Sequence, residues 1–221
     1  MIPVRWYIAY PLSYRHIEKL MAERGVDIDH STINRWVIKY APLLERAFTK
    51  RYQSQVGSSW RMDETTIKVK GVWHYLYRAV DKLGATIDFM LSKKRDNKAA
   101  KSFFRKAIGY SGRPQKVTID KSGSNNAALR SLNKRLKKKD KIESRQIKYL
   151  NNIAEQDHRL IKKITRPTLG FKSYSSANAT LLGIELHHML HKGLHTKSNN
   201  IPVFEQFYAL AAYIRPEITA A

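Results

Sequence analysis

The stretch WRMDETTIKVKGVWHYLYRAVDKLGATIDFML, residues 60–91, decides the fold of this chain. Apolar and polar side chains alternate along it with a period of two, and Gly71 and Gly84 interrupt the alternation. Alternation of this kind predicts strands, and the short glycine turns between them predict hairpins. We therefore expect three antiparallel strands in succession, over residues 60–70, 72–80 and 85–91.

The segments that follow this meander alternate between helical and strand-like patterns. Two short apolar pieces, 116–120 and 146–148, are separated by segments with helical spacing. Helices are expected over residues 97–108, 125–139, 153–166, 174–194 and 201–213. A meander followed by strands in crossover units is the order of an RNase H-like α/β core, a mixed five-stranded sheet with flanking helices.

The first 40 residues carry helical spacing instead. Ser13 is expected to cap a helix that ends near Gly25. Ser31 is expected to cap the next helix, over residues 32–40, which has an apolar stripe and a polar face. Two short helices around a glycine turn indicate either a helix-turn-helix DNA-binding module or an ordinary helical hairpin.

Composition favours the DNA-binding module. The 221 residues include 41 Lys and Arg against 18 Asp and Glu, and a folded chain with a net charge of +23 usually binds a polyanion. A membrane surface and a purely electrostatic or ribosomal partner are also compatible with this charge. The absence of cysteine excludes disulfides and thiolate zinc sites. The chain also lacks a signal peptide and an apolar run of about 18 residues, so we expect a cytoplasmic protein without a membrane span.

Acidic residues are scarce, so their positions are informative. Residues 97–184 contain 21 Lys and Arg but only five acids. Asp63 lies within the first predicted strand, where a carboxylate is unfavourable as core, and Asp120 closes the fourth. The first and fourth strands are neighbours in an RNase H-like sheet, and sites form at the carboxyl ends of strands. The two carboxylates would then repel each other unless a cation lies between them.

A third carboxylate completes a candidate metal site. Glu155 lies near the start of the helix predicted over residues 153–166, whose first turn could project it over the sheet edge. Oxygen-only ligands suit Mg²⁺ or Mn²⁺, and three carboxylates would hold two ions for an in-line displacement at phosphorus. Strand alternation sends Glu64 to the opposite face, and Asp157 is the substitute acid. The competing interpretation is that these acids are only turn or cap residues.

The aromatic residues of the meander admit two interpretations. Such side chains can pack in the core of a sheet, or they can be exposed and stack on bases. We expect the core position for Trp60, Trp73, Tyr75 and Tyr77.

Short motifs in a fixed order run through about residues 4–193. They include LSYR at 12–15, MDET at 62–65, YLYRAVD at 75–81, EQDH at 155–158 and LGFKS at 169–173. In this order they resemble the bacterial insertion-sequence transposases with a DDE catalytic domain, the group named insertion sequence six. The 34 residues between Asp120 and Glu155 match the D-D-34-E signature of that family.

The resemblance implies an RNase H-like domain in which Asp63, Asp120 and Glu155 bind two Mg²⁺ ions, with Mn²⁺ as a substitute and no small-molecule cofactor. It also implies that Lys162, seven residues after the glutamate, contacts DNA phosphate, and Lys121 is expected to do the same. The helix-turn-helix would recognise terminal inverted repeats. Its candidate readers are Ser31, Thr32, Asn34, Arg35 and Lys39.

The implied function is transposition, by metal-dependent DNA cleavage and strand transfer at insertion-sequence ends. We expect a nucleoid-associated homodimer or larger assembly that binds terminal repeats and target DNA. The expected regions are a helix-turn-helix module over 1–42, a linker over 43–58, the catalytic domain over 59–196 and a tail with a short helix over 197–221. Family members usually begin with more residues ahead of Val4, so the first module is expected to be truncated. Three rival functions are a defective remnant, a helix-turn-helix regulator without catalysis, and a nuclease that cuts without joining.

Overall fold

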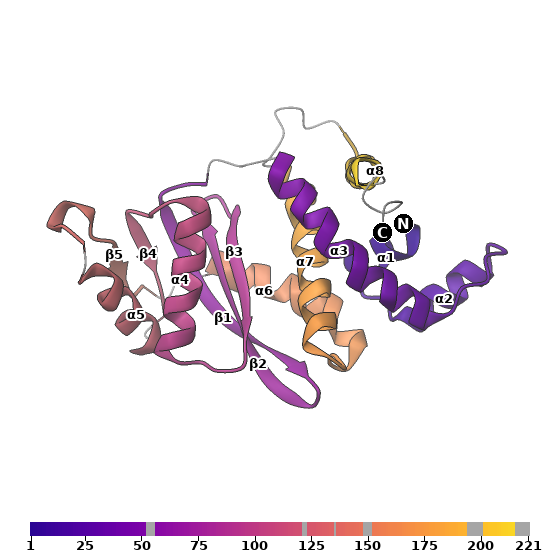
Figure 1. The fold of residues 1–221 in the computed structure, drawn as a ribbon, viewed down its shortest axis with the longest axis horizontal. Coiled ribbons are helices and arrows are strands. Elements are labelled where there is room, and N and C mark those ends of the chain that lie inside the picture. The colour runs from indigo at the N-terminus through magenta and orange to yellow at the C-terminus, as the bar shows by residue number, and fades with distance from the viewer. Residues whose placement is uncertain (52–55, 121–122, 135, 148–151, 194–200, 215–221) are drawn as a thin grey trace. The chain divides into compact units, whose positions relative to one another are not determined.

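The chain forms two compact units. The sheet unit comprises residues 55–68 and 72–160, and the helical unit comprises residues 1–54, 69–71 and 161–221. Figure 1 labels the elements of both. The computed structural model describes residues 1–51, 56–120, 123–134, 136–147, 152–193 and 201–214. None of the helices within these ranges is long and apolar enough to cross a membrane.

The sheet unit is built on five strands. Their bounds are Ser59–Val69 (β1), Val72–Asp81 (β2), Thr86–Ser92 (β3), Lys116–Thr118 (β4) and Glu143–Arg145 (β5). The order across the sheet is β3-β2-β1-β4-β5, with β2 antiparallel to β3 and β4 parallel to both β1 and β5. This topology confirms the predicted mixed five-stranded sheet of an RNase H-like core.

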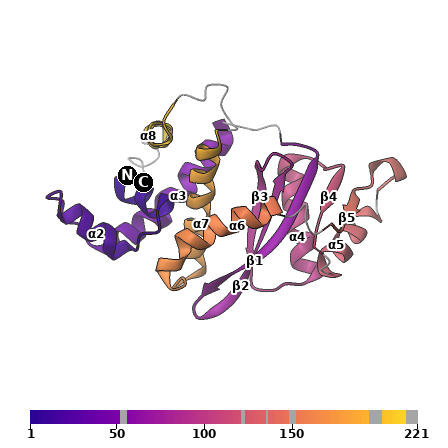
Figure 2. The same cartoon turned by 180° about the vertical axis from the view of Figure 1, so that it is seen from behind.

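Helices cover both faces of this sheet. They are α4 (Asn97–Ser111), α5 (Gly123–Asn133), the short 3₁₀ helix η1 (Lys138–Asp140) and the first part of α6 (Asn152–Thr165). Helices α4 and α5 pack together over one face, and the first part of α6 lies over the other (Figure 1 and Figure 2). Trp60 and Met62 of β1 are buried with Phe103 and Phe104 of α4. Since side chains alternate along a strand, the residues of β1 that alternate with Trp60 and Met62 face α6.

A buried carboxylate fixes the turn between β2 and β3. Asp81 closes β2, and its Oδ1 accepts hydrogen bonds from the backbone N–H groups of Leu83 (2.8 Å) and Ala85 (2.9 Å). Its Oδ2 accepts a third from Gly57 N, at 3.0 Å. An aspartate that bonds the backbone two residues on forms an Asx turn. The bond to Gly57 also anchors the chain where it enters β1.

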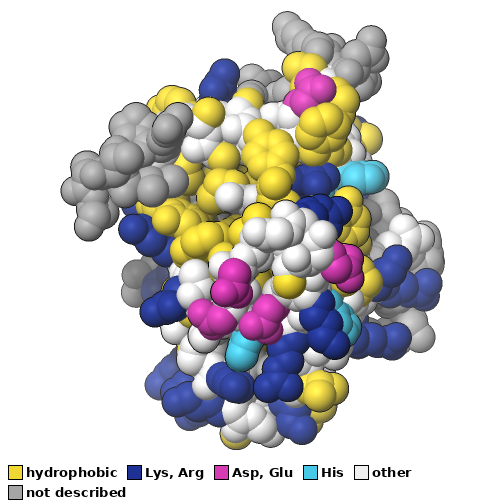
Figure 3. Space-filling view, turned by 90° about the vertical axis from the view of Figure 1, so that its right-hand side faces the viewer, with side chains coloured by type: hydrophobic (Ala, Val, Ile, Leu, Met, Phe, Trp, Pro, Cys, Tyr) yellow, Lys and Arg dark blue, Asp and Glu magenta, His cyan; other side chains and the backbone are white. Residues whose placement is uncertain are grey.

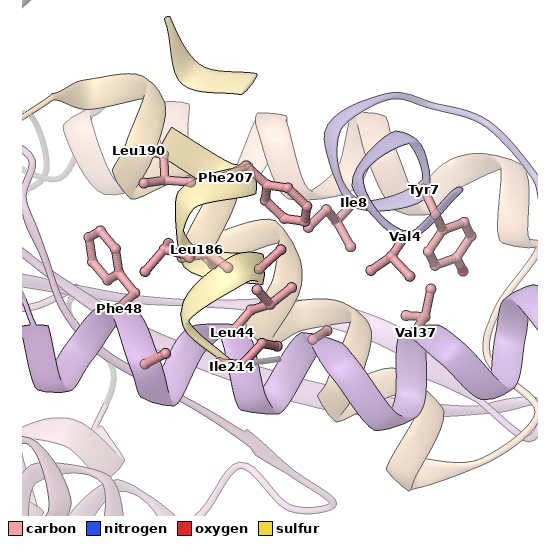
Figure 4. Packing of buried hydrophobic residues seen from close by; sticks show 14 of the residues in the cluster. Val4, Tyr7, Ile8, Val37, Leu44, Phe48, Leu186, Leu190, Phe207 and Ile214 are labelled. Atoms are coloured by element: carbon pink, nitrogen blue, oxygen red, sulfur yellow. The ribbon is translucent and has the colours of Figure 1, made fainter. Parts of the chain in front are cut away.

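The helical unit packs its helices around one apolar core. They are α1 (Ile2–Ala9), α2 (Tyr14–Ala22), α3 (His30–Arg51), the end of α6, η3 (Arg166–Thr168), α7 (Tyr174–Lys192) and α8 (Val203–Tyr213). Helix α7 packs along α3. Figure 4 shows Val4 of α1, Leu44 of α3, Leu186 of α7 and Phe207 of α8 meeting in this core. The long helix α7 therefore packs with the N-terminal helices, although it lies within the range predicted for the catalytic domain.

One predicted helix cap is confirmed and the other is wrong. The Ser13 hydroxyl accepts a hydrogen bond from His16 N, and His16 Nδ1 accepts one from Ser13 N, so the two form a capping box for α2. Helix α3 begins one residue ahead of Ser31, and Asp29 holds its start. The Asp29 carboxylate accepts the backbone N–H groups of Ser31 (2.6 Å) and Thr32 (3.3 Å). A full negative charge at the positive end of a helix favours Asp29 over a serine hydroxyl.

Two helices differ in length from the predicted ones. Helix α3 continues through Pro42 to Arg51, whereas the pattern predicts an end near residue 40. Its later turns carry Leu44 and Phe48 into the core, and this burial outweighs the hydrogen bond that proline cannot make. Helix α5, predicted to reach residue 139, ends at Asn133.

The early end of α5 has a local cause. The Asn133 side chain donates to Ile142 O and accepts from Ile142 N, each at 2.9 Å, so it pins the returning chain. The lysines over 137–141 would also repel one another within a helix. With the turn fixed there, β5 begins at Glu143, three residues ahead of the strand predicted over 146–148.

The aromatic prediction is right for Trp60 and Tyr77, which are buried, and wrong for Trp73. Trp73 is 57% exposed. It precedes the part of β2 that pairs with β3, which begins at Tyr75. Its ring lies beside Lys68, whose Nζ is 5.9 Å from the ring centre. Alternation predicts which side chains share a face of the sheet. It does not predict where along a strand the pairing with its neighbour begins.

Candidate active site

Asp63 and Asp120 are carried by neighbouring parallel strands. Arg61 of β1 stands opposite Thr118, the last residue of β4, and the same register continued by two residues would set Asp120 opposite Asp63. The sequence predicts that Asp120 ends this strand. In the structure β4 stops at Thr118, so Asp120 follows the strand by two residues. The structure therefore confirms that the first and fourth strands are neighbours, and Asp120 lies beyond the carboxyl end of β4.

Asp63 points to the α6 side of the sheet. Its Oδ2 lies 3.4 Å from Nε2 of His158, and its side chain is 19% exposed. His158 is 5% exposed, and neither of its ring nitrogens has a hydrogen bond within the described residues. The Asp63 carboxylate is thus a polar group beside this buried ring. The sequence pattern predicts no role for His158. Its position three residues after Glu155 could have suggested one, because residues three apart lie on the same face of a helix.

Glu64 points to the α4 and α5 side, as alternation predicts. Its side chain is 2% exposed, and its Oε1 accepts a hydrogen bond from Nδ2 of Asn125 at 2.9 Å. The same nitrogen lies 3.3 Å from Oδ1 of Asp120. Burial raises the pKa of Glu64, while the Asn125 hydrogen bond and the charge of Arg95 act in the opposite direction. Glu64 therefore belongs to the surroundings of Asp120, a role that its predicted face did not suggest.

A guanidinium joins Glu64 to Asp120. Arg95 lies in the loop between β3 and α4, and its Nη2 donates to Asp120 Oδ2 at 3.0 Å. The same Nη2 is 3.5 Å from Glu64 Oε2, which has no hydrogen bond in the described part of the chain. The side chains of Arg95 and Asp120 are 42% and 36% exposed. Sequence spacing gave no signal for Arg95, because the contact joins three segments that are distant in the chain.

The other predicted residues of the site are only partly visible. Helix α6 carries both Glu155 and Lys162, and Lys162 is exposed. The side chain of Glu155 and all of Lys121 lie outside the described residues. The structure thus places Asp63 on β1 and Asp120 just beyond the adjacent strand β4, with Asp63 beside His158 of α6 and Asp120 beside Asn125 of α5, and it shows the helix that carries Glu155.

The chemistry of the donors fits a hard divalent cation. Asp63 and Asp120 offer carboxylate oxygens, the ligands that Mg²⁺ and Mn²⁺ prefer, and the chain has no cysteine. The described side chains, which do not include that of Glu155, contain no group of three metal-ligating residues arranged around one point. The Arg95 guanidinium already places one positive charge beside the Asp120 carboxylate.

The predicted repeat-reading residues lie along the first turns of α3. The Asp29 carboxylate accepts hydrogen bonds from the hydroxyls of Ser31 and Thr32, the latter at 2.8 Å. Thr32 Oγ1 in turn accepts from Nη2 of Arg35, at 2.8 Å. Asn34 is half-buried, and its Oδ1 accepts a hydrogen bond from Ser176 of α7 at 3.4 Å. Most polar atoms of this set therefore have partners within the protein.

The exposed cations of α3 are better placed to meet a polyanion. Arg35 and Lys39 are both exposed, and Lys39 Nζ lies 5.6 Å from the Tyr40 ring. On the face of the molecule drawn in Figure 3, Lys and Arg side chains gather in broad groups, whereas the acids are few. Such a surface suits the phosphate backbone of a nucleic acid.

Comparisons with known proteins agree on one family. The profile of the DDE domain of IS240-type transposases matches residues 57–194. The chain is 44% identical over 191 residues to the transposase of the insertion sequence-like element IS431mec of Staphylococcus aureus, covering 86% of this chain and 83% of that protein. The transposase of insertion sequence element IS257 in transposon Tn4003, also from Staphylococcus aureus, has the same identity and coverage.

Solved structures give a more distant likeness. A chain of the simian T-cell lymphotropic virus intasome in complex with PP2A regulatory subunit B56 gamma matches with a TM-score of 0.46 and 18% identity, covering 67% of this chain and 58% of that chain. The domain match and the staphylococcal relatives decide the family. This chain belongs to the DDE transposases of the insertion sequence six family, and it is a polynucleotidyl transferase that cleaves DNA and transfers strands.

Proposed function

We propose that Asp63, Asp120 and Glu155 bind two Mg²⁺ ions at the carboxyl end of β4, and that Mn²⁺ can replace them. The observation that supports this most is the parallel β1–β4 register, because its continuation by two residues would set the two aspartates opposite each other on adjacent strands. Bound there, the ions would supply positive charge that activates the attacking oxygen and stabilises the leaving one. The chain's own part is to hold the carboxylates in position and to orient DNA beside them.

The reaction is proposed to proceed in two displacements. Water attacks phosphorus at the insertion-sequence end and loses a proton, and the bond to the 3′ oxygen breaks, leaving a 3′ hydroxyl and a 5′ phosphate. That hydroxyl then attacks a phosphodiester of the target, and the 3′ oxygen of the target strand leaves and takes up a proton. Neither step needs a covalent bond to the protein. Asp63 and Asp120 would hold the cations, and through them the reacting phosphate, in one place for both steps.

DNA contacts are proposed for two groups of residues. Lys162 and Lys121 would hold phosphate close to the carboxylates. The residues of α3 would read the terminal inverted repeats, with the exposed cations Arg35 and Lys39 as the main contacts. Ser31, Thr32 and Asn34 complete this set, although their side chains already have protein partners. Arginine and lysine at a helix surface can contact both phosphates and base edges.

Assembly follows from the reaction. Two insertion-sequence ends must be joined to one target, so we propose that a homodimer or larger assembly acts on DNA at the nucleoid. The net charge of +23 would keep free copies apart and let DNA bring them together.

A strand-transfer assay with a labelled repeat end tests the proposal. Asp63→Asn, Asp120→Asn and Glu155→Gln are each expected to lower the rate by about a hundredfold or more, because each removes a charged metal ligand. Asp27→Asn, an exposed acid between α2 and α3, is the matched control. Chelation of divalent ions should stop the reaction, and MnCl₂ should restore it.

The same assay separates the rival functions. Full activity of the Asp120→Asn protein would reject the proposed site. Repeat binding without cleavage would indicate a regulator or a defective remnant, and cleavage without joining would indicate a nuclease.

A further inference from the structure

We propose that Arg95 is a displaceable counter-ion of Asp120, which neutralises that carboxylate until a divalent cation binds and then moves onto Glu64. The inference rests on the proposed function, because it takes Asp120 to be a metal ligand. It adds a second binding position for the guanidinium and a role for Glu64.

The position of the guanidinium carries the first step. A single nitrogen, Nη2 of Arg95, lies 3.0 Å from Asp120 Oδ2 and 3.5 Å from Glu64 Oε2. The first contact is a hydrogen bond, whereas the second lies at the limit for one. The guanidinium therefore stands between two carboxylates and is bonded to the more exposed of them.

Glu64 offers the second position. Its side chain is 2% exposed, and Oε2 has no hydrogen bond among the residues described, while Oε1 is held by Asn125. A buried carboxylate oxygen without a donor is unfavourable, so a full hydrogen bond from Arg95 would stabilise it. The Arg95 side chain is 42% exposed, and its Nη2 already lies 3.5 Å from that oxygen.

A divalent cation would force this movement. Mg²⁺ binds carboxylate oxygen at about 2.0–2.1 Å in a near-octahedral shell, and a guanidinium bonded to the same oxygen obstructs that shell and repels the ion. The buried Asn125 amide lies 3.3 Å from the other oxygen of Asp120, so the carboxylate keeps its orientation when Arg95 leaves. Metal affinity at Asp120 then includes the cost of displacing Arg95, reduced by the hydrogen bond gained at Glu64.

The two residues must therefore act in opposite directions on metal affinity. Mn²⁺ binding to the full chain without DNA can be measured by isothermal titration calorimetry. Arg95→Gln is expected to lower the Kd for Mn²⁺ about two- to fivefold, the range of a partly exposed ion pair. Arg105→Gln, an exposed arginine of α4, is the matched control and should leave the Kd unchanged. Glu64→Gln keeps an acceptor for Asn125 but removes the second position, so the Kd should rise by a similar factor.

A double-mutant cycle distinguishes displacement from a general charge effect. If Glu64 acts through Arg95, Glu64→Gln should change nothing in the Arg95→Gln protein, whereas two independent charge effects would add. An unchanged or raised Kd for Arg95→Gln, or additive effects, would overturn the inference. If Glu64→Gln fails to fold, Glu64→Asp, which keeps the charge but shortens the side chain that receives Arg95, takes its place in the cycle. Failure of the metal site itself looks different: Mn²⁺ would not bind the wild-type chain, or would still bind Asp120→Asn, and the inference would fall with it.

Discussion

Nε2 of His158 lies 3.4 Å from Oδ2 of Asp63, and both side chains are largely shielded from solvent. The histidine comes from α6 and the aspartate from β1, so the contact ties the helix that carries Glu155 to the strand that carries the first acid. Side chains that contact a ligating carboxylate commonly fix its orientation. We therefore propose that His158 positions the Asp63 carboxylate.

Replacement of His158 by alanine is expected to lower the strand-transfer rate about ten- to a hundredfold, the usual effect of removing such a neighbour. The Asp63 carboxylate would rotate more freely, so the variant should also need more Mg²⁺ for half-maximal rate. His158→Gln keeps a polar group beside Asp63 and should recover part of the loss. His191→Ala, at an exposed position of α7, is the control. Equal rates and equal Mg²⁺ dependence for the two alanine variants would contradict the assignment.

Gly183 marks a close approach in the helical unit. A Cβ at this position would stand 2.6 Å from Cγ2 of Ile8 and 3.2 Å from Cβ of Ala41, so α7 meets α1 and α3 where it has no side chain. Gly183→Ala is expected to lower the free energy of unfolding by about 1–3 kcal/mol, because the core must shift. Gly109→Ala in α4 meets no atom within 4 Å and should raise it by about 0.5–1 kcal/mol. Urea unfolding measures both, and a stabilised Gly183→Ala protein would show that the helices are not packed this closely.

His187 gives the helical unit a dependence on pH. Burial lowers its pKa from 6.5 to about 4, and the charges of Arg5, His191 and His188 act in the same direction. Below pH 6.5 the unfolded chain takes up a proton at this histidine that the folded chain does not. Stability is therefore expected to fall as the pH falls from 6.5 to 4, by about 1–3 kcal/mol from this residue.

Urea unfolding of the wild type and of His187→Gln at pH 7 and pH 4.5 measures this contribution. The glutamine cannot titrate, so the variant should lose less stability over the interval. The same loss in both proteins would assign the pH dependence to other groups.

Two tryptophans of the meander should behave in opposite ways. Trp60 is buried, and its indole N–H donates to Gly57 O at 3.0 Å, so Trp60→Ala is expected to cost about 3–5 kcal/mol. Trp73 is 57% exposed, and Trp73→Ala should change stability by less than about 1 kcal/mol. Thermal unfolding of the two variants is the measurement. A large loss for Trp73→Ala would show that its ring is covered in the folded protein.

The sequence predicts those features that local physics determines. The alternation over residues 60–91 predicts the meander, and Ser13 predicts the start of α2, because these signals act over a few residues. Helix ends that depend on distant partners are missed. The helix predicted to end at residue 40 continues past Pro42 because of its core contacts, and Asn133 ends α5 through a bond to Ile142.

The residues of the candidate site also differ in how far the sequence predicts them. The sequence can place Asp63 and Asp120 with adjacent strands, because the strand order of an RNase H-like sheet makes β1 and β4 neighbours. Arg95 cannot be predicted, because its contact depends on how a loop leaves β3 and on a buried carboxylate from another strand. For His158, spacing gives a weak signal, since a helix start shifted by one residue would turn it away from Asp63.

The β1–β4 pairing has a consequence for the order of folding. It joins Ser59 to Lys116, 57 positions later, whereas the meander closes through turns of a few residues. Long-range parallel pairing must overcome a larger loop-closure entropy and forms slowly. A chain emerging from the ribosome would therefore fold its meander with Asp63 in place well before Asp120 arrives. The segments that carry the two acids become neighbours only when β4 pairs with β1, so a partly made chain would not yet hold the proposed site.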